Sequence, residues 1–325
     1  MTMALLSILG GFILLTYGAD WLVKGSASLA LRLQISSLVI GLTVVAYGTS
    51  MPEMIVSTQT AWHGQGDISI GNVVGSNIFN IAFILGIAAL ICPMNAHVKM
   101  IKIDTPIMVV VTLIFLALFR DMHLSRLEGA FFIAGALVYT VGNYIGAKKT
   151  GLPEDEVEFK PEGLPSMLHE IGYILIGLVL LVIGSRVLVD GSVFVAKWAG
   201  VSEAVIGLTI IAGGTSLPEL ATSVTAAIKK EPDIALGNVV GSNIFNILGI
   251  LGLSAVISPL QGTNISWTDM GVMTLAAVLL VPMLYTGKRL SRAEGAVLLA
   301  LYVGYIVWLL QNPGAAPVAP AAPAI

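Results

Sequence analysis

Two glutamates, Glu53 and Glu219, are the residues of this chain best placed to do chemistry, because each lies inside a long apolar segment. Each ends the pattern Gly-Thr-Ser-x-Pro-Glu, and the two copies lie 166 positions apart. A carboxylate inside a membrane is costly unless it faces a partner or a water-filled cavity, so such a residue usually marks an ion pathway. A duplicated pair predicts one central cation site, built half from each repeat.

A second motif recurs at the same interval. Residues 71–80 read Gly-Asn-Val-Val-Gly-Ser-Asn-Ile-Phe-Asn, and residues 237–246 repeat them without change. In each copy a serine and an asparagine four positions apart share one helix face, and two glycines four apart allow close helix approach. That approach would bring the polar face beside the glutamate. The polar positions are Ser76 and Asn80 in the first copy and Ser242 and Asn246 in the second.

Each Gly-Thr-Ser-x-Pro-Glu pattern is expected to break its helix. Proline removes a backbone N–H and clashes with the preceding turn, and glycine weakens the helix just upstream. Breaks near residues 48–52 and 214–218 would free the backbone carbonyls of Ala46, Thr49, Ala212 and Thr215. With the hydroxyls and carboxylates, these carbonyls are hard oxygen donors, which suit Ca²⁺ and Na⁺.

Each of these features has a simpler structural reading when it is taken alone. A Gly-x-x-x-Gly pattern usually reflects packing, a proline kink is often only structural, and an intramembrane asparagine frequently joins two helices. A glutamate at membrane depth is harder to explain by packing. The duplication of all these features together favours a functional site.

The composition places the motifs in a membrane. Of the 325 residues, 56% are hydrophobic and only 11% are charged, whereas soluble domains are about 25% charged. Cys92 is the only cysteine, which excludes an internal disulfide and a cysteine-based metal cluster. The chain lacks a phosphate-binding loop, so we expect no cofactor beyond transported ions. The expected surroundings are the lipid bilayer, with no nucleic acid and no obligatory protein partner.

Ten apolar segments are long enough to be membrane spans. They lie at about 4–31, 37–61, 68–92, 105–119, 127–146, 171–196, 204–228, 235–258, 270–286 and 293–310. Five spans per repeat is an odd number, so the second repeat would start on the opposite side of the membrane. The predicted fold class is an all-α polytopic membrane protein of two inverted five-helix repeats, with broken helices at the centre.

The predicted domain organisation follows from the repeat. Residues 1–147 form the first repeat, 148–170 a polar linker, 171–311 the second repeat and 312–325 a disordered Pro/Ala tail. An extracytoplasmic N-terminus places most loop lysines and arginines inside, as the positive-inside rule requires. We therefore expect an inner-membrane protein with both termini extracytoplasmic and the linker in the cytoplasm.

Taken together, the two motif pairs resemble the α-repeats of the cation/Ca²⁺ exchanger superfamily, with the prokaryotic sodium/calcium exchangers as the nearest branch. The resemblance covers essentially the whole chain. It implies ten transmembrane helices in two inverted halves. It also implies alternating access, in which the first and sixth helices slide over the other eight.

The resemblance also implies roles for residues at matching positions. The Ca²⁺ ligands would be Glu53 and Glu219 with the carbonyls of Thr49 and Thr215. Flanking Na⁺ sites would use Ala46, Thr49, Ser50, Glu53 and Ser76 from the first repeat, and Ala212, Thr215, Ser216, Glu219 and Ser242 from the second. Asn80 and Asn246 would be the remaining central polar positions.

One departure from the family pattern, and one contrast with the proton-coupled branch, bear on the coupling ion. Some relatives have aspartate at the position of Asn246, whereas this site would have two carboxylates only. One Ca²⁺, two Na⁺ or two protons would neutralise them, and three Na⁺ would leave a net charge that moves through the membrane field. Proton-coupled exchangers of the superfamily typically read Gly-Asn-x-x-Glu in the first motif, which favours Na⁺ coupling here. Stoichiometry and K⁺ dependence stay open.

Four further charges lie in the first and sixth spans. Asp20 and Lys24 are four apart, and Arg186 and Asp190 occupy the equivalent positions with the signs reversed. Internal i, i+4 pairs are the simpler prediction. The alternative is pairing across the two helices, Asp20 with Arg186 and Lys24 with Asp190.

The sequence thus predicts a secondary antiporter, not an enzyme, that exchanges Ca²⁺ for Na⁺. The main alternative within this class is an H⁺/Ca²⁺ or K⁺-dependent Na⁺/Ca²⁺ exchanger. A cation channel is the rival from another class, although channels usually obtain acidic rings from oligomeric symmetry. An intramembrane enzyme is disfavoured because all four histidines lie in or near loops, which leaves no Ser/His pair at membrane depth, and because a zinc-binding His-Glu-x-x-His motif is absent.

Overall fold

The computed structural model describes residues 1–150, 166–199, 212–263 and 265–312. Within these ranges the chain is almost entirely helical, as predicted, and eight helices are long and apolar enough to cross a membrane. The helix pair Ser37–Thr49 and Met51–Trp62 passes the same test when its two members are taken together, with a bend of 48° between them, and counts as a ninth candidate span if it crosses as one unit. The predicted span 204–228 falls partly outside the described residues. Its described part contains α11 (Ala212–Gly214) and α12 (Leu217–Ile228).

The first half of the chain holds the elements up to Thr150. They are α1 (Thr2–Leu33), α2 (Ser37–Ile40), η1 (Gly41–Val45), α3 (Ala46–Thr49), α4 (Met51–Trp62), α5 (Gly66–Ile78), η2 (Phe79–Leu85), α6 (Gly86–Ile91), β1 (Met94–Asn95), η3 (Met100–Asp104), α7 (Thr105–Leu118), η4 (Phe119–Asp121), β2 (His123–Leu124) and α8 (Arg126–Thr150).

The second half begins at α9. Besides α11 and α12, its elements are α9 (Met167–Trp198), α13 (Pro232–Phe245), η7 (Asn246–Leu251), α14 (Gly252–Ile257), β3 (Leu260–Gln261), α15 (Trp267–Tyr285), η8 (Thr286–Lys288), β4 (Arg289–Leu290) and α16 (Arg292–Gln311). The two-residue strands were not predicted. They pair antiparallel as β1 with β4 and β2 with β3, and so tie the two halves together at their loops.

The most deeply buried of the eight candidate spans are the two that carry the asparagine motifs. The spans 66–91 and 232–257 are each 72% buried over their most apolar windows, whereas the other spans are 22–39% buried. The outer helices expose large apolar side chains such as Leu5, Phe12 and Leu137, as helices in contact with lipid acyl chains do. The polar motifs therefore lie inside the bundle.

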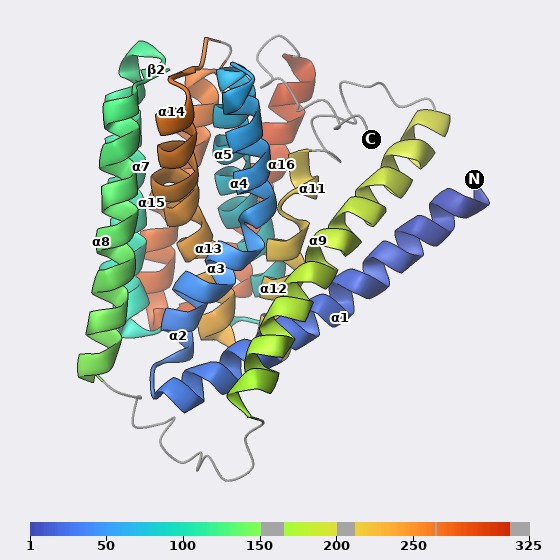
Figure 1. The fold of residues 1–325 in the computed structure, drawn as a ribbon, viewed down its shortest axis with the longest axis vertical. Coiled ribbons are helices and arrows are strands. Elements are labelled where there is room, and N and C mark those ends of the chain that lie inside the picture. The colour runs from blue at the N-terminus through green and yellow to red at the C-terminus, as the bar shows by residue number, and fades with distance from the viewer. Residues whose placement is uncertain (151–165, 200–211, 264, 313–325) are drawn as a thin grey trace.

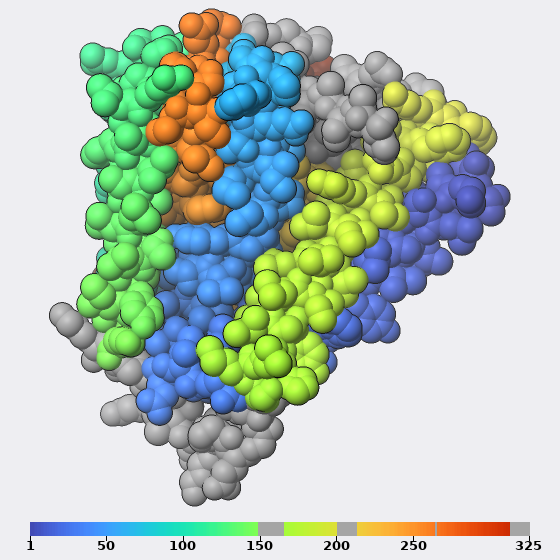
Figure 2. Space-filling model, in the orientation of Figure 1, coloured from blue at the N-terminus to red at the C-terminus, as the bar shows by residue number. Residues whose placement is uncertain are grey.

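The long helices α1 and α9 lie side by side and cross the upright bundle obliquely (Figure 1). In the space-filling view they cover one flank of the molecule (Figure 2). Glycines let their backbones approach: a Cβ on Gly18 would lie 2.9 Å from the carbonyl oxygen of Gly177, and a Cβ on Gly11 would lie 2.7 Å from that of Gly184. This register shows that the two helices run antiparallel, with small residues at their interface.

The predicted linker and tail lie largely outside the described residues. Residues 151–165 of the linker and 313–325 of the tail are not described. The ranges 1–147 and 171–311 therefore remain predictions as domain boundaries.

Candidate cation site

The two glutamates sit at equivalent points of two half-helices. Pro52 and Pro218 occupy the first turns of α4 and α12, where a missing N–H costs nothing, and each glutamate follows its proline directly. Glu53 is 1% exposed and Glu219 is fully buried. The proline-induced start of each half-helix thus delivers one carboxylate to the interior.

The serine before each proline bonds to the opposite glutamate. Ser50 Oγ donates to Glu219 Oε1 at 2.8 Å, and Ser216 Oγ donates to Glu53 Oε1 at 2.8 Å. Ser-x-x-Glu is the pattern of a local capping box, yet neither serine caps its own helix. The exchange places the two carboxylates together at the meeting of the two halves.

True capping boxes elsewhere in the chain provide the contrast. Ser291 accepts from the backbone N–H of Glu294, whose carboxylate accepts from the backbone N–H and hydroxyl of Ser291. Ser266 and Asp269 form the same arrangement at the start of α15. A serine three residues before an acidic residue therefore caps its own helix at Ser266 and Ser291, whereas at Ser50 and Ser216 it joins the two halves of the chain.

Two asparagines that the sequence analysis did not single out hold the glutamate turns. Asn72 Nδ2 donates to the backbone carbonyl of Glu53 at 3.3 Å and to Ser57 Oγ at 2.9 Å. Asn238 Nδ2 makes the same bonds to the carbonyl of Glu219, at 3.4 Å, and to Ser223 Oγ, at 2.9 Å. The sequence feature that points to Asn72 and Asn238 is their position as the second residue of each repeated Gly-Asn motif.

The predicted central asparagines lie beside a second pair of asparagines. Asn80 Nδ2 donates to Asn243 Oδ1 at 3.1 Å, and Asn246 Nδ2 donates to Asn77 Oδ1 at 2.9 Å. All four side chains are at most 1% exposed. Asn80 and Asn246 lie at or just after the points where α5 and α13 widen into the π-helical turns η2 and η7, a distortion that often marks functional sites.

Four buried carboxylate and amide oxygens of this region have no hydrogen-bond partner. They are Glu53 Oε2, Glu219 Oε2, Asn80 Oδ1 and Asn246 Oδ1. An unpaired buried acceptor carries the full cost of its desolvation. Two carboxylate and two amide oxygens, equivalent in pairs across the repeat, suit a hard cation with oxygen ligands.

The flanking predicted residues of the first repeat also gather here. Thr49 Oγ1 donates to Asn238 Oδ1 at 3.0 Å and lies 3.3 Å from the carbonyl oxygen of Ala46. Ser242 Oγ donates to that same carbonyl at 3.3 Å. Asn238 and Ser242 both belong to α13, so two polar contacts join the broken helix to the opposite repeat.

The equivalent residues of the second repeat, Ala212, Thr215 and Ser216, are only partly described. Ser76 Oγ lies 3.1 Å from Ser216 Oγ, and Thr215 Oγ1 is buried without a partner. Ala212 begins α11, and the side chains just before it fall outside the described residues. The glycine pair of α13 behaves as predicted: a Cβ on Gly241 would lie 2.6 Å from Leu42 O.

Among the described residues, the ligands that the site offers are oxygen atoms. In the described part of the chain, no group of three or more His, Cys, Asp or Glu side chains is arranged to hold a metal ion. The acidic charge of the site therefore comes from two carboxylates. Amide, hydroxyl and carbonyl oxygens supply the remaining donors.

The predicted intramembrane ion pairs form only in part. Lys24 Nζ lies 2.8 Å from Asp20 Oδ2, which is the internal pair of α1, and Lys229 at the end of α12 pairs with the same aspartate. Arg186 and Asp190 form no ion pair within the described ranges, and both are exposed. The alternative pair of Asp20 with Arg186 is not formed, because in the antiparallel register these positions lie far apart along the helices.

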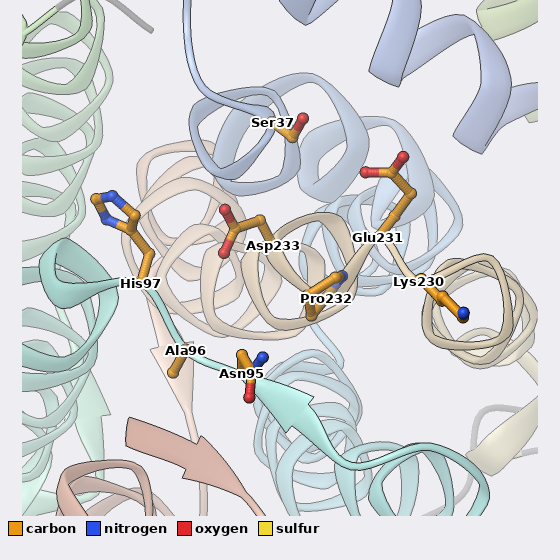
Figure 3. A pocket seen from close by; sticks show the side chains of 8 residues that line it. All are labelled: Ser37, Asn95, Ala96, His97, Lys230, Glu231, Pro232 and Asp233. Atoms are coloured by element: carbon orange, nitrogen blue, oxygen red, sulfur yellow. The ribbon is translucent and has the colours of Figure 1, made fainter. Parts of the chain in front are cut away.

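A separate pocket of about 410 Å³ opens where α2 and α13 begin. Figure 3 shows the carboxylates of Glu231 and Asp233 and the imidazole of His97 around it. Burial raises the pKa of Glu231. None of the predicted site residues lines this pocket, so it is distinct from the central glutamate pair.

Comparison with known proteins gives a consistent result along the whole chain. The family described as sodium/calcium exchanger protein matches residues 3–145 and 169–311. The putative antiporter CaxA of Alkalimonas amylolytica is 40% identical over 321 residues, which cover 96% of this chain and 100% of the relative. The sodium/calcium exchanger MaX1 of Methanosarcina acetivorans is 34% identical and covers 95% and 99%.

A further relative is named as an inner membrane protein, and solved structures of a sodium-calcium exchanger also match this chain. The inner membrane protein YrbG of Escherichia coli is 37% identical over 95% of this chain and 96% of the relative. A structure of the sodium-calcium exchanger NCX_Mj soaked with Na⁺ and Sr²⁺ is 33% identical, superposes with a TM-score of 0.81, and covers 94% of this chain and 98% of its own.

Proposed function

This chain belongs to the family of sodium/calcium exchanger proteins, and we propose that it exchanges Ca²⁺ for Na⁺ across the membrane by alternating access. Membership makes it a multi-pass membrane transporter of the cation/Ca²⁺ antiporter class and not an enzyme. The observation that supports the finer proposal is the exchange of serine bonds between Glu53 and Glu219, which leaves one oxygen of each carboxylate buried and unpartnered.

Charge balance explains how one site can serve both ions. Two ionised carboxylates are neutralised by one Ca²⁺ or by two Na⁺, and both cations take oxygen ligands. An empty pair of like charges in a dry interior is costly. Only the protein with an occupied site therefore changes readily between its outward-facing and inward-facing states. Competition for the same oxygens then couples the two fluxes without ATP.

The assignments of individual residues follow from this proposal. Ca²⁺ is held by Glu53, Glu219 and the carbonyls of Thr49 and Thr215, while Asn80 and Asn246 supply the central amide oxygens. Na⁺ ions use the flanking donors of Ala46, Thr49, Ser50, Ser76, Ala212, Thr215, Ser216 and Ser242 together with the glutamates. The polar contacts of Ala46, Thr49 and Ser242 described above support the assignment of these three residues.

The proposed architecture has ten spans in two inverted repeats, 1–147 and 171–311, with a cytoplasmic linker and extracytoplasmic termini. The glycine-lined interface of α1 and α9 supports their movement as one unit against the bundle. A Glu158→Cys variant, treated in oriented vesicles with a thiol reagent that does not cross the membrane, tests the orientation. Labelling of the introduced thiol from the extracytoplasmic side alone would overturn it.

Purified protein in liposomes tests the coupling. Uptake of ⁴⁵Ca²⁺ is measured against an outward Na⁺ gradient, an outward proton gradient and an outward K⁺ gradient of equal size. We expect uptake to follow the Na⁺ gradient, to saturate with Ca²⁺ and to require the counter-ion. Uptake that follows the proton gradient instead would establish H⁺/Ca²⁺ exchange, and unsaturable flux without a counter-ion would establish a channel.

A further inference from the structure

We propose that Asn77 and Asn243 are positioning residues that decide which atom of the Asn80 and Asn246 side chains faces the cation. Each acts on the asparagine of the other repeat. The inference rests on the proposed function, because it takes the amide oxygens of Asn80 and Asn246 as cation ligands. It assigns to the middle asparagine of each repeated motif a role that its sequence neighbours do not reveal.

The orientation starts from two backbone carbonyls. An asparagine amide can turn over and exchange its nitrogen for its oxygen, but a main-chain carbonyl cannot. Asn77 Nδ2 donates to the carbonyl of Asn243 at 3.3 Å, and Asn243 Nδ2 donates to the carbonyl of Asn77 at 3.4 Å. Turning either amide over would set two oxygens against each other, so Oδ1 of each is held on the opposite side.

The held oxygens then orient the central amides. Oδ1 of Asn243 accepts from Asn80 Nδ2 at 3.1 Å, and Oδ1 of Asn77 accepts from Asn246 Nδ2 at 2.9 Å. Each central asparagine therefore commits its amino group to the other repeat. Its own oxygen is left without a hydrogen-bond partner in either case.

Burial makes this orientation consequential. None of the four side chains is more than 1% exposed, so water does not replace a lost partner. An amide oxygen carries partial negative charge and binds a cation, whereas an amino group in the same place would repel it. Met108 Sδ, 3.7 Å from Asn243 Nδ2, is only a weak acceptor and does not compete with the carbonyl of Asn77.

A carboxylate offers a direct test, because its two oxygens are equivalent and it needs no orientation. Asn243→Ala should raise the Ca²⁺ concentration for half-maximal uptake about tenfold, the loss expected for one buried hydrogen bond. In an Asn80→Asp background the same change should have an effect below about threefold. In an Asn246→Asp background it should keep its full effect, because Asn243 does not contact Asn246 through its oxygen.

The mirrored set supplies the matched control. Asn77→Ala should be rescued by Asn246→Asp and not by Asn80→Asp. Equilibrium Ca²⁺ binding to the purified variants, measured by calorimetry, should follow the same pattern as uptake. A merely structural role would lower the melting temperature in all backgrounds alike and show no crossed rescue.

The outcomes separate the inference from the proposed function. Absence of Ca²⁺ binding and uptake in the unsubstituted protein would refute the function itself. Normal wild-type exchange with additive effects in every double variant would overturn the positioning role alone. Failure of both alanine variants to fold in every background would assign the four asparagines to folding and would equally overturn the proposal.

Discussion

Replacing Glu53 or Glu219 by glutamine removes one charge from the site and keeps nearly the same shape. The glutamine oxygen can still accept the hydrogen bond that Ser216 or Ser50 donates at 2.8 Å. Both positions are at most 1% exposed, so solvent does not screen the change. The substitution therefore isolates the electrostatic contribution of one carboxylate.

The magnitude follows from Coulomb's law. Two unit charges about 4 Å apart interact by about 4 kcal/mol at an effective dielectric constant of about 20, and a divalent ion doubles that value. Relief of repulsion between the carboxylates and a lower desolvation cost offset about half of it. We therefore expect Ca²⁺ to bind about a thousandfold more weakly to either variant, for a net loss of about 4 kcal/mol. Na⁺ should lose less than half as much free energy, because its attraction to the carboxylate is half as large while the offset does not depend on the bound ion.

Calorimetric titration of the purified variants with Ca²⁺, and with Na⁺ in competition, measures both affinities. Glu231→Gln is the matched control, because Glu231 is a partly buried carboxylate of the separate pocket and should leave both affinities unchanged. Ca²⁺ affinity within threefold of wild type in either site variant would refute the reasoning. Equal losses for Na⁺ and Ca²⁺ would show that shape, and not charge, governs the site.

Three further changes test the packing and the exchanged serines. Gly11→Ala should lower the melting temperature and abolish transport, because its Cβ would lie 2.6 Å from the backbone nitrogen of Leu188, whereas Gly10→Ala meets nothing within 4 Å and should be silent. Ser216→Ala should weaken Ca²⁺ binding about tenfold, because the Glu53 carboxylate loses the donor that positions it, and should also lower the melting temperature, since hydrogen bonds to charged groups contribute about 1.5–3 kcal/mol. Ser291→Ala, which removes a local cap, should lower the melting temperature by the loss of about 1 kcal/mol and leave binding intact. Gly241→Ala should impair transport, because its Cβ would meet Leu42 O at 2.6 Å; wild-type uptake by this variant would show that α13 and the broken helix do not need this contact.

The sequence alone determined the features that depend on length and local pattern. The described spans begin and end within a few residues of the predicted apolar segments, because the number of apolar residues needed to cross a bilayer is set by its thickness. The bend between Thr49 and Met51 lies in the predicted break, since proline acts on its own helix. The Asp20–Lys24 contact also spans a single helical turn. The 166-residue repeat singled out Glu53 and Glu219 before any geometry was known.

Only the tertiary structure decided which side chains meet across the halves. A Ser-x-x-Glu pattern is the same at Ser216 and at Ser291, yet one serine bonds to the opposite glutamate and the other to its own helix. The pairing of Lys229 with Asp20 likewise joins residues far apart in the chain. The orientation of Asn80 depends on Asn243 of the other repeat, whose own amide is held by the backbone carbonyl of Asn77. Such contacts arise where two helices are brought within hydrogen-bond distance, and no local spacing encodes that approach.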